Sequence, residues 1–301
     1  MSVNQVLQLL LLAAIWGASF LFLVISVPEF GAILLIEIRV LLAALVLLPF
    51  WYLREAKTQA KLVRQNIGTI FWVGLLNSAA PFALFAYSVL YISGGLASVL
   101  NSTAPLWGAL VAWLWLKERL SMMASFGLIV GVSGVIVLVS GELLLEQSSF
   151  DLVTKASGLL AAATAPILYG IAANLTSAKL GKISALSTTT FSLVAAALIL
   201  LPFALFSLPE AMPSQTAWLS ALVLSIVCTA FAYLVFFRLI SEIGSTRTIT
   251  VAFLIPVFGT LWGVIFIQET VSISMLVGMT IILIGTALVV GLWRPKINKK
   301  M

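Results

Sequence analysis

Histidine is absent from this 301-residue chain, cysteine occurs once, and charged residues make up only 9% of the sequence. The lack of histidine excludes histidine-based acid–base catalysis, most catalytic triads, and the usual zinc and haem ligand sets. The single cysteine, Cys228, can form neither an internal disulfide nor a cysteine metal cluster. We therefore expect no metal and no cofactor.

The scarcity of charge also excludes an ordinary soluble domain. Such a domain needs about 25% charged residues to cover its surface, whereas this chain is 62% hydrophobic and has a mean hydropathy of +1.20. Its solvent must be a lipid bilayer. The net charge of +6 then reflects the loops and not nucleic-acid binding, because the basic residues form no patch with aromatic residues in a polar context.

Ten segments are long and apolar enough to cross a bilayer, which takes about 20 residues. They predict an all-α polytopic membrane protein with ten transmembrane helices. The predicted spans are residues 5–27, 30–53, 67–90, 96–116, 124–140, 156–177, 184–206, 216–240, 248–267 and 274–292. The first span is too long for the apolar core of a signal peptide, so we expect it to be retained. The longest predicted loops are 54–66 and 141–155.

Lysine and arginine collect on one side of this topology. With the N-terminus placed in the cytoplasm, Lys155 alone falls in an outer loop and Arg39 lies within a span, while the rest of the 16 basic residues lie in cytoplasmic connections and the C-terminal tail. The positive-inside rule then predicts that both termini are cytoplasmic, in a multi-pass protein of the cell inner (plasma) membrane.

The chain repeats itself. Leu100–Ser121, LNSTAPLWGALVAWLWLKERLS, is echoed 151 residues later by Val251–Ser272, VAFLIPVFGTLWGVIFIQETVS. A second match, LLPF at 47–50 and 200–203, has an offset of 153. The polar run 101–103 has no counterpart in the second copy, so we expect it to contribute to substrate selectivity. A nearly constant offset over this distance indicates an internal duplication.

Each half holds five predicted spans, an odd number, so the second copy enters the membrane from the opposite side. The sequence therefore predicts two inverted five-helix repeats, residues 1–147 and 148–301. Inverted repeats are typical of transporters, because two halves of similar structure and opposite direction can exchange conformations and so give alternating access.

Polar and aromatic side chains at membrane depth are the candidates for a substrate site. We expect the substrate to contact Trp16, Ser19, Arg39, Asn77, Asn101, Tyr169, Asn174 and Tyr233. The aromatic residues would supply apolar surface, the asparagines would bind polar groups, and Arg39 would hold a carboxylate if the substrate has one. For each serine or asparagine, a hydrogen bond to a neighbouring helix is the alternative interpretation.

Glu37 and Arg39 are the two charges deep in a span. Residues two apart lie about 200° around a helix, so these two cannot pair directly on one face. Glu37 is the only acid at this depth and hence the candidate for proton coupling, with an inter-helix hydrogen bond as the alternative.

Two prolines and two glutamates recur at the same offset. Pro105 and Pro256 each remove a backbone donor within a span, so they are hinge candidates, with a structural kink as the alternative. Glu118 and Glu269 follow spans four and nine, and we interpret them as structural residues that satisfy backbone donors in the tight turn before the next helix.

These motifs resemble a known family when taken together. WGASF at 16–20, IRVLLAALVLLP at 38–49, and the segment from Ala104–Pro105 to Glu118 are similar to the EamA-type members of the drug/metabolite transporter superfamily. The second half repeats the signature as AFAY at 230–233 and IPVFGTLWG at 255–263. The resemblance covers essentially the whole chain.

The resemblance implies an inner-membrane exporter or facilitator of metabolites, often amino acids, with a central cavity built from spans one to four and six to nine. The residues that match the family pattern are Trp16, Arg39, Pro105, Glu118, Tyr233, Pro256 and Glu269. The small multidrug members of the superfamily use a glutamate in their first span. This sequence has no acid there, which argues against a multidrug proton or cation mechanism.

The sequence thus predicts a transporter and not an enzyme, with a small-molecule substrate and the lipid bilayer as its partners and no nucleic acid. The alternatives are a membrane-embedded enzyme acting on lipid and a receptor or scaffold. An enzyme needs several ionisable groups near one interface, and the inverted repeat gives a receptor no advantage. The oligomeric state stays open, and a monomer is compatible with the sequence.

Overall fold

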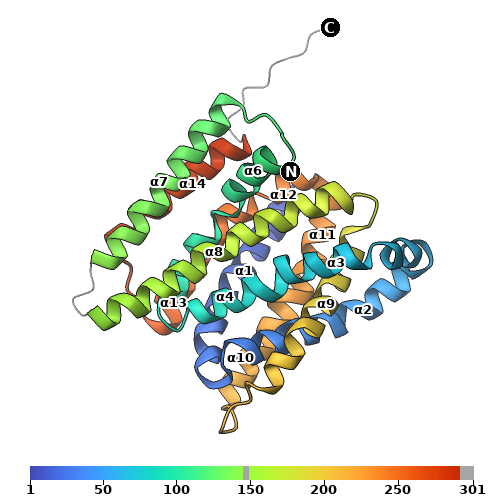
Figure 1. The fold of residues 1–301 in the computed structure, drawn as a ribbon, viewed down its shortest axis with the longest axis horizontal. Helices are drawn as coiled ribbons and strands as arrows, with labels where there is room; N and C mark the ends of the chain where they lie inside the picture. The colour runs from blue at the N-terminus through green and yellow to red at the C-terminus, as the bar shows by residue number, and fades with distance from the viewer. Residues whose placement is uncertain (145–148, 292–301) are drawn as a thin grey trace.

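The computed structural model describes residues 1–144 and 149–291. Over this part of the chain every regular element is a helix, which confirms the predicted all-α class (Figure 1). Nine helical segments there are long and apolar enough to cross a membrane, and the shorter segment Val251–Ile267, with 17 residues, is apolar as well. The protein is therefore a multi-pass membrane protein.

The described helices follow the predicted spans in order. They are α1 (Val3–Phe30), α2 (Ala32–Gln65), α3 (Ile67–Gly74), η1 (Leu75–Ala79), α4 (Ala80–Ser88), α5 (Gly94–Asn101), α6 (Ala104–Trp115), α7 (Met122–Leu144), α8 (Ser149–Lys179), α9 (Ala185–Leu205), α10 (Gln215–Ser225), η2 (Ile226–Phe231), α11 (Ala232–Ile243), α12 (Ser245–Thr248), α13 (Val251–Ile267) and α14 (Ile273–Val290).

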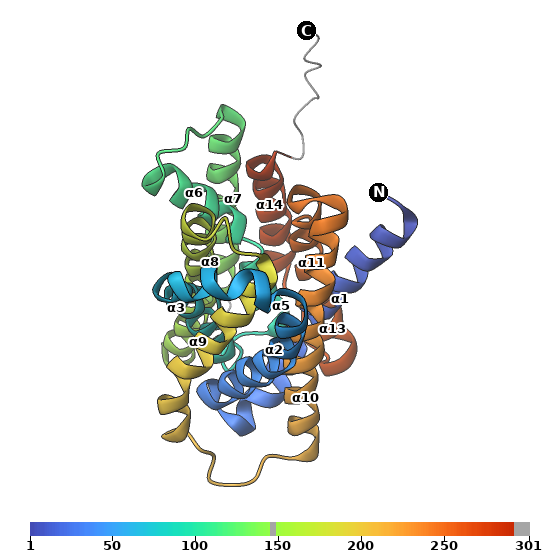
Figure 2. The ribbon, with the colours of Figure 1, turned by 90° about the vertical axis from the view of Figure 1, so that its right-hand side faces the viewer.

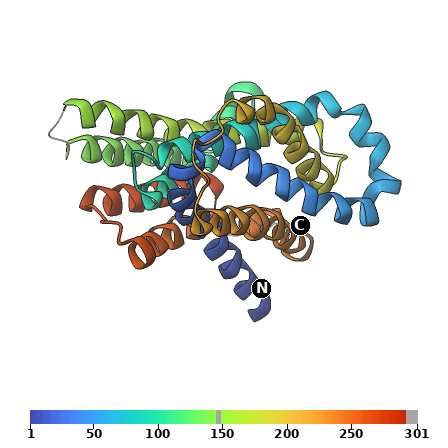
Figure 3. The same ribbon diagram turned by 90° about the horizontal axis from the view of Figure 1, so that it is seen from below.

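Helix α2 corrects one prediction, because residues 54–65 continue the helix instead of forming a loop. This extension is charged on its free face, which explains why it reads as a loop. Its other face buries Val63 against Ile70 and Leu180, so tertiary packing stabilises it. The turn between α2 and α3 lies at the opposite end of the long axis from α7 (Figures 1 and 3).

Spans four and nine are each broken in two, and the two prolines sit differently. Pro105 lies in the first turn of α6, where a missing N–H costs no helical hydrogen bond. Pro256 lies inside α13. In span four the hydroxyls of Ser102 and Thr103 are buried and donate to Val99 O (2.7 Å) and to Leu100 O (2.6 Å). These two residues of the polar run therefore satisfy backbone carbonyls at the break.

Backbone irregularities recur at the offset of the sequence repeat. The two π-helical segments, η1 and η2, begin at Leu75 and Ile226, which are 151 residues apart. The two non-glycine residues with positive φ, Lys117 (59°) and Gln268 (55°), have the same separation. Both features support two copies of one five-helix fold. The predicted boundary between residues 147 and 148 lies outside the described residues.

Helices α7 and α14 form a close pair at one edge of the molecule (Figure 1). Glycines make this approach possible: a Cβ on Gly285 would lie 2.5 Å from Gly131 Cα and 2.7 Å from Gly127 O. The remaining helices form the body of the bundle, in which residues 206–214 connect α9 to α10 as an extended loop (Figure 2).

The two repeats interlock inside this body. Helix α1 packs on α13, where Gly17 lies against Phe258 and Gly259. Helix α8 packs on α6 in the same manner, with Gly170 against Trp107 and Gly108. The first helix of each repeat is thus fixed to the fourth helix of the other repeat.

The glycine contact between α7 and α14 gives the first prediction. Gly285→Leu places a side chain against the backbone of α7 and forces the pair apart, at a cost of about 1–3 kcal/mol or more. Thermal unfolding in detergent should show a clear loss of stability. Gly68→Leu is the matched control, because a Cβ at Gly68 meets no atom within 4 Å. Equal melting temperatures for the two variants would contradict close packing of α7 and α14.

Candidate substrate site

Arg39 is the most deeply embedded cation of the bundle. It lies on α2, is only 7% exposed, and its Nε donates to Thr229 Oγ1 at 2.9 Å. Thr229 in turn donates to Leu224 O at 2.8 Å, five residues earlier in the chain. Thr229 belongs to the π-helical segment η2, and π-turns are frequent at functional sites. A residue from each repeat therefore builds this contact.

The Arg39 guanidinium has aromatic neighbours. Its Cζ lies 3.9 Å from the centroid of the Phe82 ring, which is a cation–π contact. Tyr169, Tyr233 and Cys228 are its other near neighbours. Among the described residues, no carboxylate forms a salt bridge with Arg39. Because a buried charge is costly without a counter-ion, this arrangement favours an anionic group bound beside it.

Aromatic rings surround the arginine. Trp16 meets Tyr233 edge to face at 6.1 Å between ring centroids, and Phe85 lies 6.3 Å from Tyr169. Trp16, Tyr169 and Tyr233 are only partly buried, so each keeps some accessible surface. The rings thus offer an apolar wall next to a fixed cation.

The smaller polar candidates divide into two groups. Asn77 lies close to Tyr233, and Ser19 lies close to the Cys228 thiol, although the Ser19 hydroxyl forms no hydrogen bond among the described residues. Both therefore belong to the group of residues around Arg39, which we call the Arg39 cluster. Its members are Trp16, Ser19, Arg39, Asn77, Phe82, Tyr169, Cys228, Thr229 and Tyr233. Asn174 instead donates to Gly108 O (2.9 Å) and Gly170 O (2.8 Å), joining α6 to α8. For Asn174 the geometry favours the alternative interpretation, a bond between helices.

Asn101 is the last residue of α5 and is half-buried. Within the described part of the chain its side chain makes no hydrogen bond. Its place at the break between α5 and α6 is compatible with the predicted binding role, which stays a prediction.

Three members of the Arg39 cluster were not among the candidates from the sequence. They are Phe82, Cys228 and Thr229. Phe82 carried a signal, because it belongs to a set of aromatic residues at helical spacing on span three. Thr229 carried no such signal, because its contact with Arg39 depends on a π-turn that no sequence pattern predicts.

Glu37 is 4% exposed, and its Oε2 has no hydrogen-bond partner in the described residues. It does not pair with Arg39, as the 200° separation on the helix leads one to expect. A buried carboxyl oxygen without a donor is compatible with a proton carrier, and the coupling role stays a prediction.

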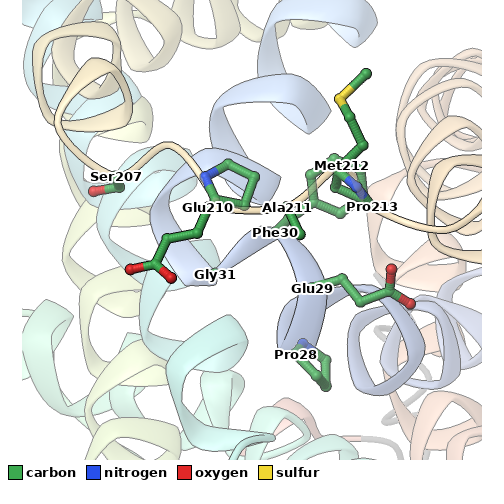
Figure 4. Close-up of a pocket in the computed structure, with 10 residues that line it drawn as sticks. Pro28, Glu29, Phe30, Gly31, Ser207, Glu210, Ala211, Met212 and Pro213 are labelled. Carbon is green, nitrogen blue, oxygen red and sulfur yellow. The ribbon is translucent and has the colours of Figure 1, made fainter.

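A recess of about 430 Å³ lies at another place, between the junction of α1 and α2 and the loop before α10 (Figure 4). Arg39 does not line it. Glu29 at its edge accepts hydrogen bonds from Ser214 N (2.5 Å) and Ser214 Oγ (2.7 Å). Glu29 thereby holds the start of α10 to the end of α1, which is a structural role.

The two turn glutamates differ from each other. Glu269 accepts hydrogen bonds from Gly94 N (2.6 Å) and Gly95 N (3.0 Å). These donors belong to the first turn of α5 in the other repeat, and not to the turn of Glu269 itself as the sequence suggested. Glu118 is exposed and has no partner among the described residues.

Comparison with known proteins places the whole chain in one family. The model of the EamA-like transporter family matches twice, at residues 4–140 and 156–291. The uncharacterized transporter YoaV of Bacillus subtilis is 22% identical, with 94% of this chain and 95% of that protein covered. Protein PecM of Dickeya dadantii is 23% identical, with 89% and 86% covered. A solved crystal structure with 18% identity, covering 96% of both chains, superposes with a TM-score of 0.63 and shows the same fold.

The Thr229 contact gives the second prediction. Thr229→Val keeps the shape of the side chain but removes the acceptor of Arg39 Nε and the bond to Leu224 O, so we expect a loss of about 1–3 kcal/mol of stability. Thr280→Val is the control, because exposed Thr280 bonds only to Leu276 O of its own helix. If Thr229→Val lowers the melting temperature no more than Thr280→Val does, the buried contact does not contribute to stability.

Proposed function

Because the chain belongs to the EamA-like transporter family, we propose that it moves a small carboxylate-bearing metabolite, such as an amino acid, by alternating access around the Arg39 cluster. The observation that carries this proposal is the buried guanidinium of Arg39, which has Thr229 and Phe82 as partners but no acid among the described residues. The aromatic wall of Trp16, Tyr169 and Tyr233 supports a substrate that also has an apolar part.

The geometry suggests how a carboxylate would bind. Thr229 occupies the Nε donor of Arg39, which leaves the two terminal nitrogens for the substrate. A guanidinium offers parallel N–H groups that match the two oxygens of a carboxylate. The substrate would also neutralise a charge that the protein leaves uncompensated, so binding gains from relief of that cost. Asn77 and Ser19 would contact other polar groups of the substrate.

We further propose that the protein lies in the cell inner membrane with both termini in the cytoplasm. The concentration of lysine and arginine on one side of the topology supports this orientation. The Glu118 end of the bundle is then cytoplasmic, and the Glu269 end faces outward. Export or facilitated passage of the metabolite fits the family.

Arg39 provides the decisive test. A panel of amino acids and their carboxamide analogues should be screened by counterflow in proteoliposomes. We expect the wild type to prefer the carboxylates, Arg39→Ala to abolish their transport, and Arg39→Lys to weaken it about tenfold or more, because lysine keeps the charge but loses the fork of donors. Arg238→Lys, at an exposed ion pair with Glu242, is the matched control. Unchanged transport by Arg39→Ala would refute the proposal.

Glu37 allows a separate test of coupling. We expect Glu37→Gln to abolish the stimulation of transport by a pH gradient while exchange driven by the substrate gradient persists, because glutamine cannot release a proton. Exposed Glu210→Gln is the control. Wild-type transport that ignores an imposed pH gradient would leave Glu37 with a structural role only.

A further inference from the structure

Within the described residues, the fourth helices of the two repeats pack on each other at the Glu269 end of the bundle and not at the Glu118 end. Helix α5 packs on the second half of α13, where a Cβ on Gly259 would lie 2.6 Å from Ser98 Cβ. At the edge of this contact the Glu269 carboxylate accepts the amides of Gly94 and Gly95. The Glu269 end of the bundle is therefore closed by packing and by two hydrogen bonds to a carboxylate.

The 151-residue offset relates this closed end to a second set of residues at the other end. Glu269 corresponds to Glu118, Gly259 to Gly108, and the pair 94–95 to the pair 245–246 at the start of α12. The turn that presents each glutamate is the same. Lys117 and Gln268 have the same left-handed conformation.

The hydrogen bond that closes each turn is also repeated. Glu118 N donates to Ala112 O (3.2 Å), and Glu269 N donates to Gly263 O (3.0 Å). The backbone thus places Glu118 and Glu269 in equivalent positions, although their side chains make different contacts.

The contact at the second end is nevertheless not made. Glu118 is exposed and without a partner among the described residues, and a Cβ on Gly108 would meet only Gly170 Cα, at 4.0 Å. Helix α6 packs on α8 and α14 and has no comparable contact with α12 or α13 within the described part of the chain.

The contact between first and fourth helices is, by contrast, formed in both copies. Gly17 meets Gly259, and Gly170 meets Gly108. The repeats are therefore symmetric at this contact and asymmetric where the two fourth helices face each other.

We propose that Glu269 and Glu118 are alternating latches of the transport cycle. The structure is the state latched by Glu269, with the Glu118 latch released. In the opposite state, Glu118 accepts the backbone amides of residues 245 and 246, the fourth helices close at that end, and Glu269 releases Gly94 and Gly95. This inference rests on the proposed alternating access, because two inverted halves change state by exchanging their conformations.

A carboxylate suits this task. It has two acceptor oxygens for two successive amides, and the first amides of a helix have no partner inside the helix. When released at the surface, it is hydrated again. The exposed Glu118 shows the released form and Glu269 the engaged form of one device.

Distance measurements between spin labels test the latches in the full-length protein in nanodiscs. One label pair, Leu90→Cys with Ile265→Cys, reports the Glu269 end, and another, Arg119→Cys with Arg247→Cys, reports the Glu118 end. All four positions are exposed, and native Cys228 is buried. We expect a short distance at the Glu269 end and a long distance at the Glu118 end for the unmodified latches.

The latch variants should move the two distances in opposite senses. Glu269→Ala should shift the ratio of the two states at least tenfold towards closure at the Glu118 end. Glu118→Ala should remove the population closed at that end. The double variant should lie between the single variants. Exposed Glu210→Ala is the control for loss of an acid.

The outcomes separate this proposal from a purely structural role and from the proposed function. If Glu118 only supports its own turn, Glu118→Ala leaves both distance distributions unchanged, and the latch is refuted. Misfolding of Glu269→Ala would be evident from size-exclusion chromatography, and Glu118→Ala, which loses no contact in this state, then decides alone. Transport by Arg39→Ala with normal latch shifts would refute the proposed substrate site but leave the latches standing.

Discussion

A buried guanidinium that has no acidic partner within the described residues is the constraint on which the rest of the structure depends. Protein interior and bilayer both penalise a bare cation. The chain reduces the penalty with an acceptor from Thr229 and the face of Phe82. These partners come from different repeats, so the site exists only when the two halves are assembled.

The way the repeats interlock determines which contacts can change. Glycine contacts fix the first helix of each repeat to the fourth helix of the other, and both copies of this contact are formed. The face between the two fourth helices is closed at one end and open at the other. Helices α1 and α8, which carry Trp16 and Tyr169 beside Arg39, pack on these fourth helices at α13 and α6.

The sequence predicted the spans well because the bilayer imposes a length of about 20 apolar residues on each. It failed where tertiary contacts overrode local polarity. Residues 54–65 read as a loop but form a helix, because Val63 on their inner face is buried. Asn174 bonds to two backbone carbonyls, which was the alternative that the sequence left open, and Thr229 contacts Arg39 from a π-turn. Arg39 was singled out because a charge at membrane depth is rare, whatever the surrounding geometry, and its binding role stays a prediction.

The duplicated glutamates are retained in both repeats although the residues that flank them differ. Glu118 is flanked by Lys117 and Arg119, whereas Glu269 is flanked by Gln268 and Thr270. The two repeats are inserted in opposite directions, so the positive-inside rule favours basic residues beside Glu118 and not beside Glu269. It does not explain why both acids are retained, because a turn can close through the backbone bond to Ala112 or Gly263 alone. The carboxylate is instead needed as an acceptor for the other repeat, as Glu269 shows by accepting the first amides of α5. Its counterpart therefore belongs to the same device, in its released form.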